Sequence, residues 1–171
     1  MNRLLKLENM LLEVIDKQEG KKENRDETLN WERLHMASSA RIAWQIAMKR
    51  NAMQQAHRVD PEIAACAAAV HDFGRILTGI QKGHAEAGFV PVKVFLKETE
   101  LFSEEEIYII AEAVKNHSSK TVEGAPLEEI VKDADVVDCY QYGLPFDRSE
   151  KEQRYRKWLA ECSVESDYLD L

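Results

Sequence analysis

Residues that favour turns are scarce in this chain of 171 residues, which contains only seven glycines and four prolines. Together these two residue types reach about half of their average share in proteins. Folds made of many short strands need frequent turn residues, so β-sandwiches and β-barrels are disfavoured. No segment alternates polar and apolar residues convincingly over five positions. The sequence therefore predicts an all-α fold.

Cysteines, basic charge and long apolar runs are also limited. The three cysteines form no Cys-x-x-Cys pair, which is typical of reduced thiols in a cytosolic protein. There is no apolar leader, and the longest strongly apolar run, residues 63–70, is too short to span a bilayer. The formal net charge is −8, which argues against nucleic-acid and anionic-membrane partners. We therefore expect a cytoplasmic protein, in which a bound cation would still allow a small phosphorylated substrate.

The length suits one compact domain, and no repeat or linker divides it, so residues 1–171 are expected to form a single unit of six or seven helices. Asn30 is expected to cap a helix, Asp60-Pro61 to start one, and Ser103-x-x-Glu106 to form a capping box. Pro91 should kink or divide a further helix. Apolar periodicity places the helices at about residues 3–18, 30–51, 61–73 (with a break at Gly74), 84–98, 103–117, 126–142 and 149–162.

Histidines carry the strongest functional signal. His57 lies among polar residues and is expected at the surface, whereas the other four face inward: His35, His71, His84 and His117. A single inward histidine is usually a core residue bonded to a backbone carbonyl. Four of them occur here together with Asp72 and with three aspartates in the apolar helix 126–142. Buried carboxylates need compensating cations or donors, and one metal site would satisfy all of these groups.

The order of these residues resembles the HD superfamily of metal-dependent phosphohydrolases over about residues 30–145. His35 is followed by the pair His71-Asp72 and then by the closing segment Lys132-Asp-Ala-Asp135-Val-Val-Asp138. The run His71-Asp72-Phe-Gly74-Arg75 resembles the family's H-D-x-G-K/R motif, in which the basic residue faces a substrate phosphate. The resemblance implies an HD-type helical bundle.

Two further segments, Gly83-His84-Ala-Glu-Ala-Gly88 and Val114-Lys-Asn-His117-Ser, resemble those that supply additional histidines in binuclear branches. Those branches include dinucleoside-tetraphosphate hydrolases and cyclic-dinucleotide phosphodiesterases. The resemblance thus implies a phosphohydrolase that acts on a phosphate ester or anhydride of a small nucleotide-like molecule through a metal-activated water. It implies one or two divalent ions, with Mn, Fe or Ni favoured and Mg as an alternative, held by His35, His71, Asp72, His84, His117 and Asp135.

Asp72 is the expected bridging ligand, and Arg75 is expected to bind substrate and neutralise charge on the transferred group. These two are the candidate catalytic residues. The final ligand stays open: a helical wheel places Asp138 nearer the apolar face, the resemblance selects Asp135, and Asp133 is a third alternative. No cysteine is expected near the site, which disfavours structural zinc.

Three other questions stay open at the level of sequence. A mononuclear site would not need His84 and His117. A catalytically silent metal- or nucleotide-binding regulatory module with the same fold is the alternative function, and the oligomeric state is not indicated. The basic run near the C-terminus is expected to be a solvated helix face, with the alternative that it frames a pocket mouth with residues 19–29; it comprises Arg148, Lys151, Arg154, Arg156 and Lys157.

Overall fold

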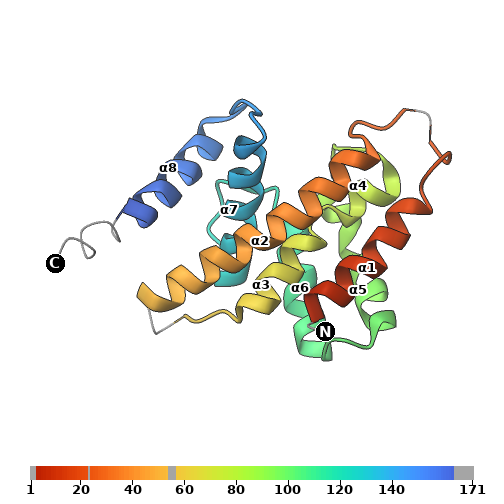
Figure 1. Ribbon diagram of the computed structural model, residues 1–171, viewed down its shortest axis with the longest axis horizontal. Coiled ribbons are helices and arrows are strands. Elements are labelled where there is room, and N and C mark those ends of the chain that lie inside the picture. Colours follow the sequence, from red (N-terminus) through yellow and green to blue (C-terminus); the bar gives the residue numbers. More distant parts are fainter. Residues whose placement is uncertain (1–2, 23, 54–56, 164–171) are drawn as a thin grey trace.

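The computed structural model describes residues 3–22, 24–53 and 57–163. Over these ranges it contains eight α-helices and no strand, which confirms the all-α prediction (Figure 1). The helices are α1 (Arg3–Asp16), α2 (Leu29–Met53), α3 (Pro61–Ala69), α4 (Phe73–Thr78), α5 (His84–Thr99), α6 (Glu104–Asn116), α7 (Pro126–Gln141) and α8 (Ser149–Ser163).

Two helix starts follow the local signals in the sequence. The Asp60 side chain accepts a hydrogen bond of 2.8 Å from the backbone N–H of Glu62 at the start of α3. At the start of α6, the Ser103 hydroxyl and the Glu106 carboxylate each accept from the other residue's backbone N–H, so the predicted capping box is confirmed. Both arrangements satisfy N–H groups that have no partner within the helix.

Other expected boundaries differ from the structure. The prediction that Asn30 caps α2 is wrong, because the Thr28 hydroxyl accepts from the N–H of Trp31 at 3.1 Å and Asn30 lies inside the first turn. Pro91 does not divide α5, which is continuous over its 16 residues. These positions show that neighbouring cap-forming residues compete, and that tertiary packing can hold a proline within a helix.

In place of the one helix expected at residues 61–73, the structure has α3 and α4. This division explains why the described residues form eight helices where six or seven are expected. Helix α3 ends at Ala69, and α4 begins at Phe73, so the break precedes Gly74 and falls on His71-Asp72. All seven side chains of residues 63–69 are buried, and five of them are alanines that let neighbouring helices approach closely. Helices α1, α2, α6 and α7 pack around α3. The turn after α3, which carries His71 and Asp72, therefore lies in the interior.

Helix α2 crosses the molecule and packs against α3 and α7, while α5 packs against α4 and α6 (Figure 1). The closeness of α4 and α5 depends on two glycines. A Cβ atom at Gly74 would overlap the carbonyl oxygen of His84 and lie 2.7 Å from the backbone nitrogen of Gly88. The absence of side chains at both glycines lets the start of α5, with His84, lie beside the turn that carries Asp72.

Helix α8 has no buried residue; half-buried Tyr155 and Trp158 pack against the core, and charged groups also hold the helix. Arg154 donates to Asp133 at 2.7 Å, to Glu129 at 2.9 Å and to the carbonyl oxygen of Lys120 at 2.8 Å. Asp133 is 1% exposed, and Arg50 donates to its second oxygen at 2.7 Å. Because both oxygens of Asp133 are bonded to arginines of α2 and α8, Asp133 contributes to helix docking and not to the histidine cluster.

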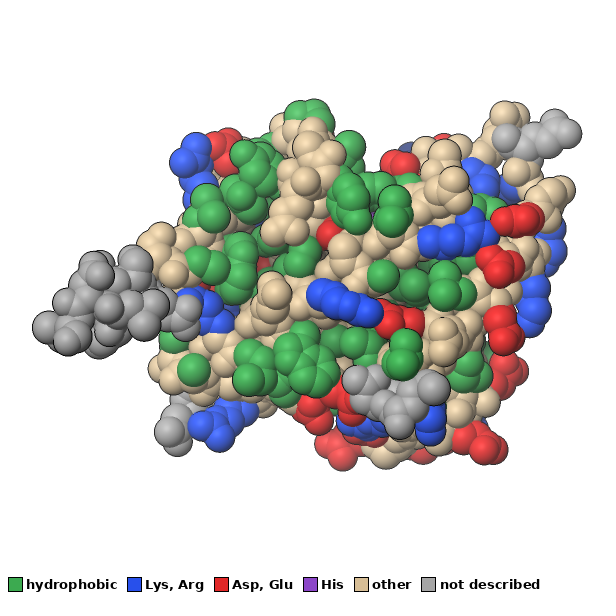
Figure 2. Space-filling view, viewed as in Figure 1, with side chains coloured by type: hydrophobic (Ala, Val, Ile, Leu, Met, Phe, Trp, Pro, Cys, Tyr) green, Lys and Arg blue, Asp and Glu red, His purple; other side chains and the backbone are tan. Residues whose placement is uncertain are grey.

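The surface carries both signs of charge. On the face shown in Figure 2, Lys and Arg side chains are scattered among acidic and apolar ones and do not form one broad patch. In the described part of the chain, no helix combines the length and the apolar character needed to cross a membrane.

Candidate metal centre

Six side chains from distant parts of the sequence meet in the interior. Their nitrogen and oxygen atoms form overlapping groups in which every pair of atoms lies within 4.8 Å. Five of the six residues are buried, and the carboxylate of the sixth, Asp135, is 17% exposed. They are His35 from α2, His71 and Asp72 from the turn after α3, His84 at the start of α5, His117 directly after α6, and Asp135 from α7.

The carboxylate of Asp72 lies between two pairs of histidines. Its Oδ2 is 3.4 Å from Nε2 of His35 and 3.1 Å from Nε2 of His71. Its Oδ1 is 2.9 Å from Nε2 of His84 and 3.6 Å from Nε2 of His117. Each oxygen therefore faces a different pair of imidazole rings, as expected of a bridging carboxylate.

The second ring nitrogen of each histidine is already hydrogen-bonded. The Nδ1 atoms of His71, His84 and His117 each lie 2.6 Å from the backbone carbonyl oxygen three residues earlier. The Nδ1 atom of His35 lies 2.5 Å from Oδ2 of Asp138. Since a carbonyl or carboxylate oxygen only accepts, we assign the ring proton to Nδ1 in all four histidines. In the neutral ring, Nε2 is then an acceptor with its lone pair directed at the centre.

These Nε2 atoms face one another at short range. The distance is 3.1 Å between His35 and His71 and 2.9 Å between His84 and His117. Two lone pairs cannot hydrogen-bond to each other, so each pair needs a proton or a cation between its nitrogens. Two ligands at right angles, each about 2.1 Å from one ion, lie about 3.0 Å apart. The arrangement therefore fits divalent cations, and imidazole with carboxylate suits first-row metals.

Asp135 and Asp138 have different positions relative to the centre. Oδ1 of Asp135 lies 3.3 Å from Nε2 of His35 and 3.7 Å from Nε2 of His71, on the side of the centre. Its Oδ2 accepts from Nζ of Lys120 at 2.5 Å, which leaves Oδ1 available for a cation. Asp138 is fully buried and holds His35 through Nδ1. Such an outer carboxylate fixes the ring orientation of a ligating histidine.

Sequence reasoning missed two buried charges. Glu32 is 1% exposed and accepts from Arg75 at 3.0 and 3.1 Å in a bidentate pair. The same guanidinium donates to Oδ2 of Asp72 and, at 2.7 Å, to the side chain of Gln81. The side chain of Lys120 is 1% exposed. Glu32 precedes His35 by one helical turn, and Lys120 follows His117 by three residues, but neither spacing belongs to the H…HD…D pattern.

The expectation that no cysteine lies near the site is wrong. Cys139 follows Asp135 by one helical turn, and its Sγ is 3.6 Å from Oδ1 of Asp135. Burial, with a further contribution from Asp135, raises the pKa of the Cys139 thiol to about 12. The thiol is therefore neutral near pH 7, in contrast to the thiolates that hold structural zinc.

Surrounding cations keep both central carboxyl groups ionised. Burial alone would raise the pKa of Asp72, but His71 and Arg75 outweigh it and hold that pKa well below its usual value. Burial acts in the same direction on Asp135, and Lys120 is the main group that holds its pKa low. The centre thus presents two anionic carboxylates to a cation.

The surroundings raise the pKa of two of the histidines and lower that of a third. Burial disfavours the protonated ring of His71, but Asp72 and Asp135 outweigh it and raise its pKa to about 9. The pKa of His35 is also raised well above its usual value, because Asp135 and Asp138 outweigh burial. Burial lowers the pKa of His117 to about 4, so this ring is neutral near pH 7.

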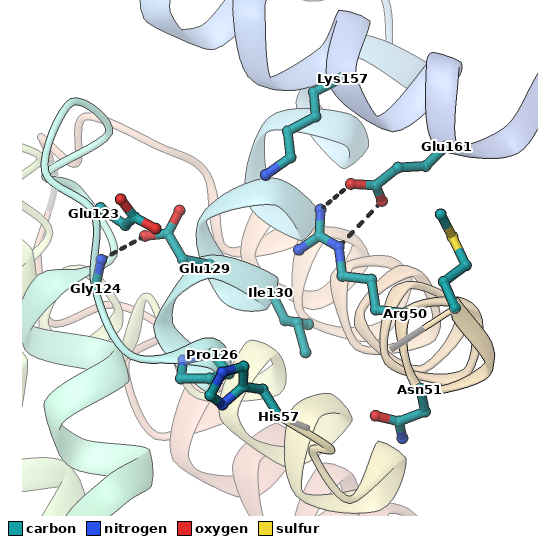
Figure 3. Close-up of a pocket in the computed structure, with 11 residues that line it drawn as sticks. Arg50, Asn51, His57, Glu123, Gly124, Pro126, Glu129, Ile130, Lys157 and Glu161 are labelled. Carbon is teal, nitrogen blue, oxygen red and sulfur yellow. Dashed lines mark hydrogen bonds and ion pairs between the residues drawn. The ribbon is translucent and has the colours of Figure 1, made fainter. Parts of the chain in front are cut away.

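A cavity of about 260 Å³ opens onto the centre. Its walls include the ring of Trp31, which stacks on His35 at a centroid distance of 4.9 Å. Charged groups on these walls are Glu27, Asp72, Arg75, Lys120, Asp135, Asp147, Arg148 and Lys151. A second cavity, of about 220 Å³, is lined by the exposed His57 and by the pair formed by Arg50 and Glu161 (Figure 3). None of the six central residues lines it.

The family assignment agrees with this geometry. A family model of the HD domain matches residues 34–140, which include all six central residues. The chain belongs to the HD domain family. HD domains are generally metal-dependent hydrolases of the phosphohydrolase superfamily, and the side chains of this HD domain could hold a metal ion. Neither a curated protein nor a solved structure gives a match to the chain.

Two facing pairs of Nε2 atoms in this HD domain predict two bound ions. Metal analysis of protein saturated with Mn²⁺ should give two ions per chain, and His84→Ala or His117→Ala should reduce this to about one. His57→Ala, which alters an exposed ring outside the centre, should leave two. A single ion in the wild type with excess Mn²⁺ would contradict the second metal site. Circular dichroism should show that the variants are folded.

Metal binding should weaken as the pH falls. The pKa of His71 is raised to about 9 and that of His35 is raised as well, so a metal ion must displace protons from this pair near pH 7. Between pH 6 and 8, apparent Mn²⁺ affinity should rise by up to about tenfold per pH unit for each proton displaced. Calorimetry in buffers of different ionisation enthalpy counts those protons. An affinity that does not change over this range would contradict the assignment.

Proposed function

We propose that this HD domain is a metal-dependent phosphohydrolase that cleaves a phosphate ester or anhydride of a small, nucleotide-like molecule. The observation that carries the proposal is the position of the Asp72 carboxylate between the two facing Nε2 pairs. One buried anion in contact with four convergent imidazoles is the arrangement that two cations sharing a ligand require. A cavity beside it gives a substrate access.

We assign the ligands in two groups. Nε2 of His35, Nε2 of His71, Oδ2 of Asp72 and Oδ1 of Asp135 would hold one ion, since both nitrogens lie within 3.7 Å of each of these two oxygens. Oδ1 of Asp72 with Nε2 of His84 and His117 would hold the other. The second group supplies three protein atoms, so it leaves more room for water or substrate.

Bound divalent ions would provide a nucleophilic water at neutral pH and polarise the phosphoryl oxygen. The protein's own residues orient this site. The carbonyl oxygens behind His71, His84 and His117 keep each proton on Nδ1 and each Nε2 directed inward. Lys120 donates to Oδ2 of Asp135 and so holds that carboxylate with Oδ1 on the side of the centre.

Arg75 has two roles in this scheme. Its contact with Oδ2 of Asp72 fixes the bridging carboxylate, and its pair with Glu32 fixes the guanidinium. Arg75 also lines the cavity beside the centre. We therefore assign it both the orientation of Asp72 and the neutralisation of charge on a substrate phosphate, which suits a planar guanidinium.

Hydrolysis should depend on Asp72 and not on His57. With Mn²⁺, Fe²⁺, Ni²⁺ or Mg²⁺ and a panel of phosphomonoesters, nucleotides and dinucleotides, at least one substrate should turn over. Loss of an outer partner of a metal ligand costs about 10–100-fold. Asp72→Ala removes a ligand itself and should therefore reduce kcat/KM by more than about 100-fold, whereas His57→Ala should change it by less than about twofold.

Thermal unfolding of Asp72→Ala separates lost chemistry from lost folding, since removal of a buried carboxylate leaves its cationic partners unpaired. Equal losses of activity in the two variants would contradict the assignment. Bound metal without turnover of any substrate would favour the regulatory binding module.

A further inference from the structure

The cavity beside the centre has a wall that the HD family match does not cover. The match ends at residue 140, but Leu144, Asp147, Arg148 and Lys151 also line the cavity. The last three belong to the start of α8 or directly precede it. Residues outside the family match therefore form part of the entrance to a site whose floor lies within the matched range.

The position of this wall is fixed by the ion pairs that dock α8. Arg154, one turn after Lys151, is bonded to Asp133, to Glu129 and to the backbone carbonyl of Lys120. Lys120 in turn contacts Asp135 in the centre. The start of α8 is thus tied to the same segment of chain that holds the central carboxylate.

The two cations of this wall have only weak local partners. Lys151 pairs with Asp147 at 2.8 Å, and Arg148 lies 3.3 Å from a carboxylate oxygen of Glu150. The side chains of Arg148 and Asp147 are 44% and 62% exposed. In each pair one member is exposed and the other, Lys151 or Glu150, is half-buried. Solvent-accessible pairs of this kind contribute little stability, so an incoming anion can replace a local carboxylate as the partner of either cation.

The floor of the cavity already provides cations for one phosphoryl group. Arg75 and Lys120 lie there beside four of the six proposed ligands, Asp72, His84, His117 and Asp135, whereas Arg148 and Lys151 come from a different segment. The cavity volume of about 260 Å³ is slightly below the range of about 300–1,000 Å³ that holds drug-sized ligands. The two sets of cations therefore suit a compact molecule with an anionic group near each end.

We propose, on the basis of the function proposed above, that Arg148 and Lys151 are specificity-determining residues that bind a second anionic group of the substrate. The scissile phosphoryl group contacts the centre, and a second phosphate or a carboxylate of the same small molecule contacts the start of α8. Substrates with a single anionic group lack this contact and bind less tightly.

Phosphonates test this inference without turnover, because their P–C bond is not cleaved by phosphate hydrolysis. Calorimetry with the Mn²⁺-loaded protein compares propylphosphonate, 1,3-propanediphosphonate and 4-phosphonobutyrate. A charge-assisted contact is worth enough for about a tenfold gain in affinity or more, so wild-type protein should prefer the diphosphonate by at least about tenfold. The phosphonobutyrate arm shows whether a carboxylate serves as the second anion.

The variant Arg148→Gln/Lys151→Gln should lose most of this preference and retain the affinity for propylphosphonate and the metal content. Arg156→Gln is the matched control, because Arg156 lies on the same helix, is 73% exposed and pairs only with Glu152 among its described partners. A preference that persists in the double variant, or no preference in the wild type, would overturn the role of Arg148 and Lys151. Failure of every phosphonate to bind would instead contradict the proposed function as well.

Discussion

Two pairs of imidazole rings flank the carboxylate of Asp72, and within each pair the two Nε2 atoms face each other. This arrangement determines which charges the interior can hold. In each ring Nδ1 is bonded to an oxygen, so each Nε2 presents a lone pair at about 3 Å from another. Such a cluster is stable only with positive charge at its centre. In the metal-free protein a proton on His35 or His71 supplies positive charge to the first pair, and in the proposed enzyme divalent cations would supply it to both pairs.

The packing of the helices brings these groups together. The buried alanines of α3 allow close packing, and the chain leaves that helix at His71-Asp72. Gly74 and Gly88 let α4 and α5 approach until His84 reaches Asp72. The carbonyl oxygens that fix three of the rings belong to the same turns as the rings, so local backbone geometry sets the orientation of each Nε2 atom.

The fold class and the six central residues could be predicted because they depend on local caps, apolar periodicity and the HD pattern. Boundaries were harder to predict. Thr28 and Asn30 are both able to cap α2, and the break precedes Gly74, whose close contact with the backbone of α5 no local signal shows. Glu32 and Lys120 could not be found in this way, because a lone charge in a helix or loop suggests solvent exposure. Their partners lie 43 and 15 residues away in the sequence.

Anomalous diffraction from crystals grown with Mn²⁺ tests the central claim most directly, because it locates the ions and shows the ring orientations together. Two anomalous peaks should flank the Asp72 carboxylate, one next to Nε2 of His35 and His71 and the other next to Nε2 of His84 and His117. Peaks elsewhere, or no peak beside either pair while its two Nε2 atoms stay about 3 Å apart, would contradict the account.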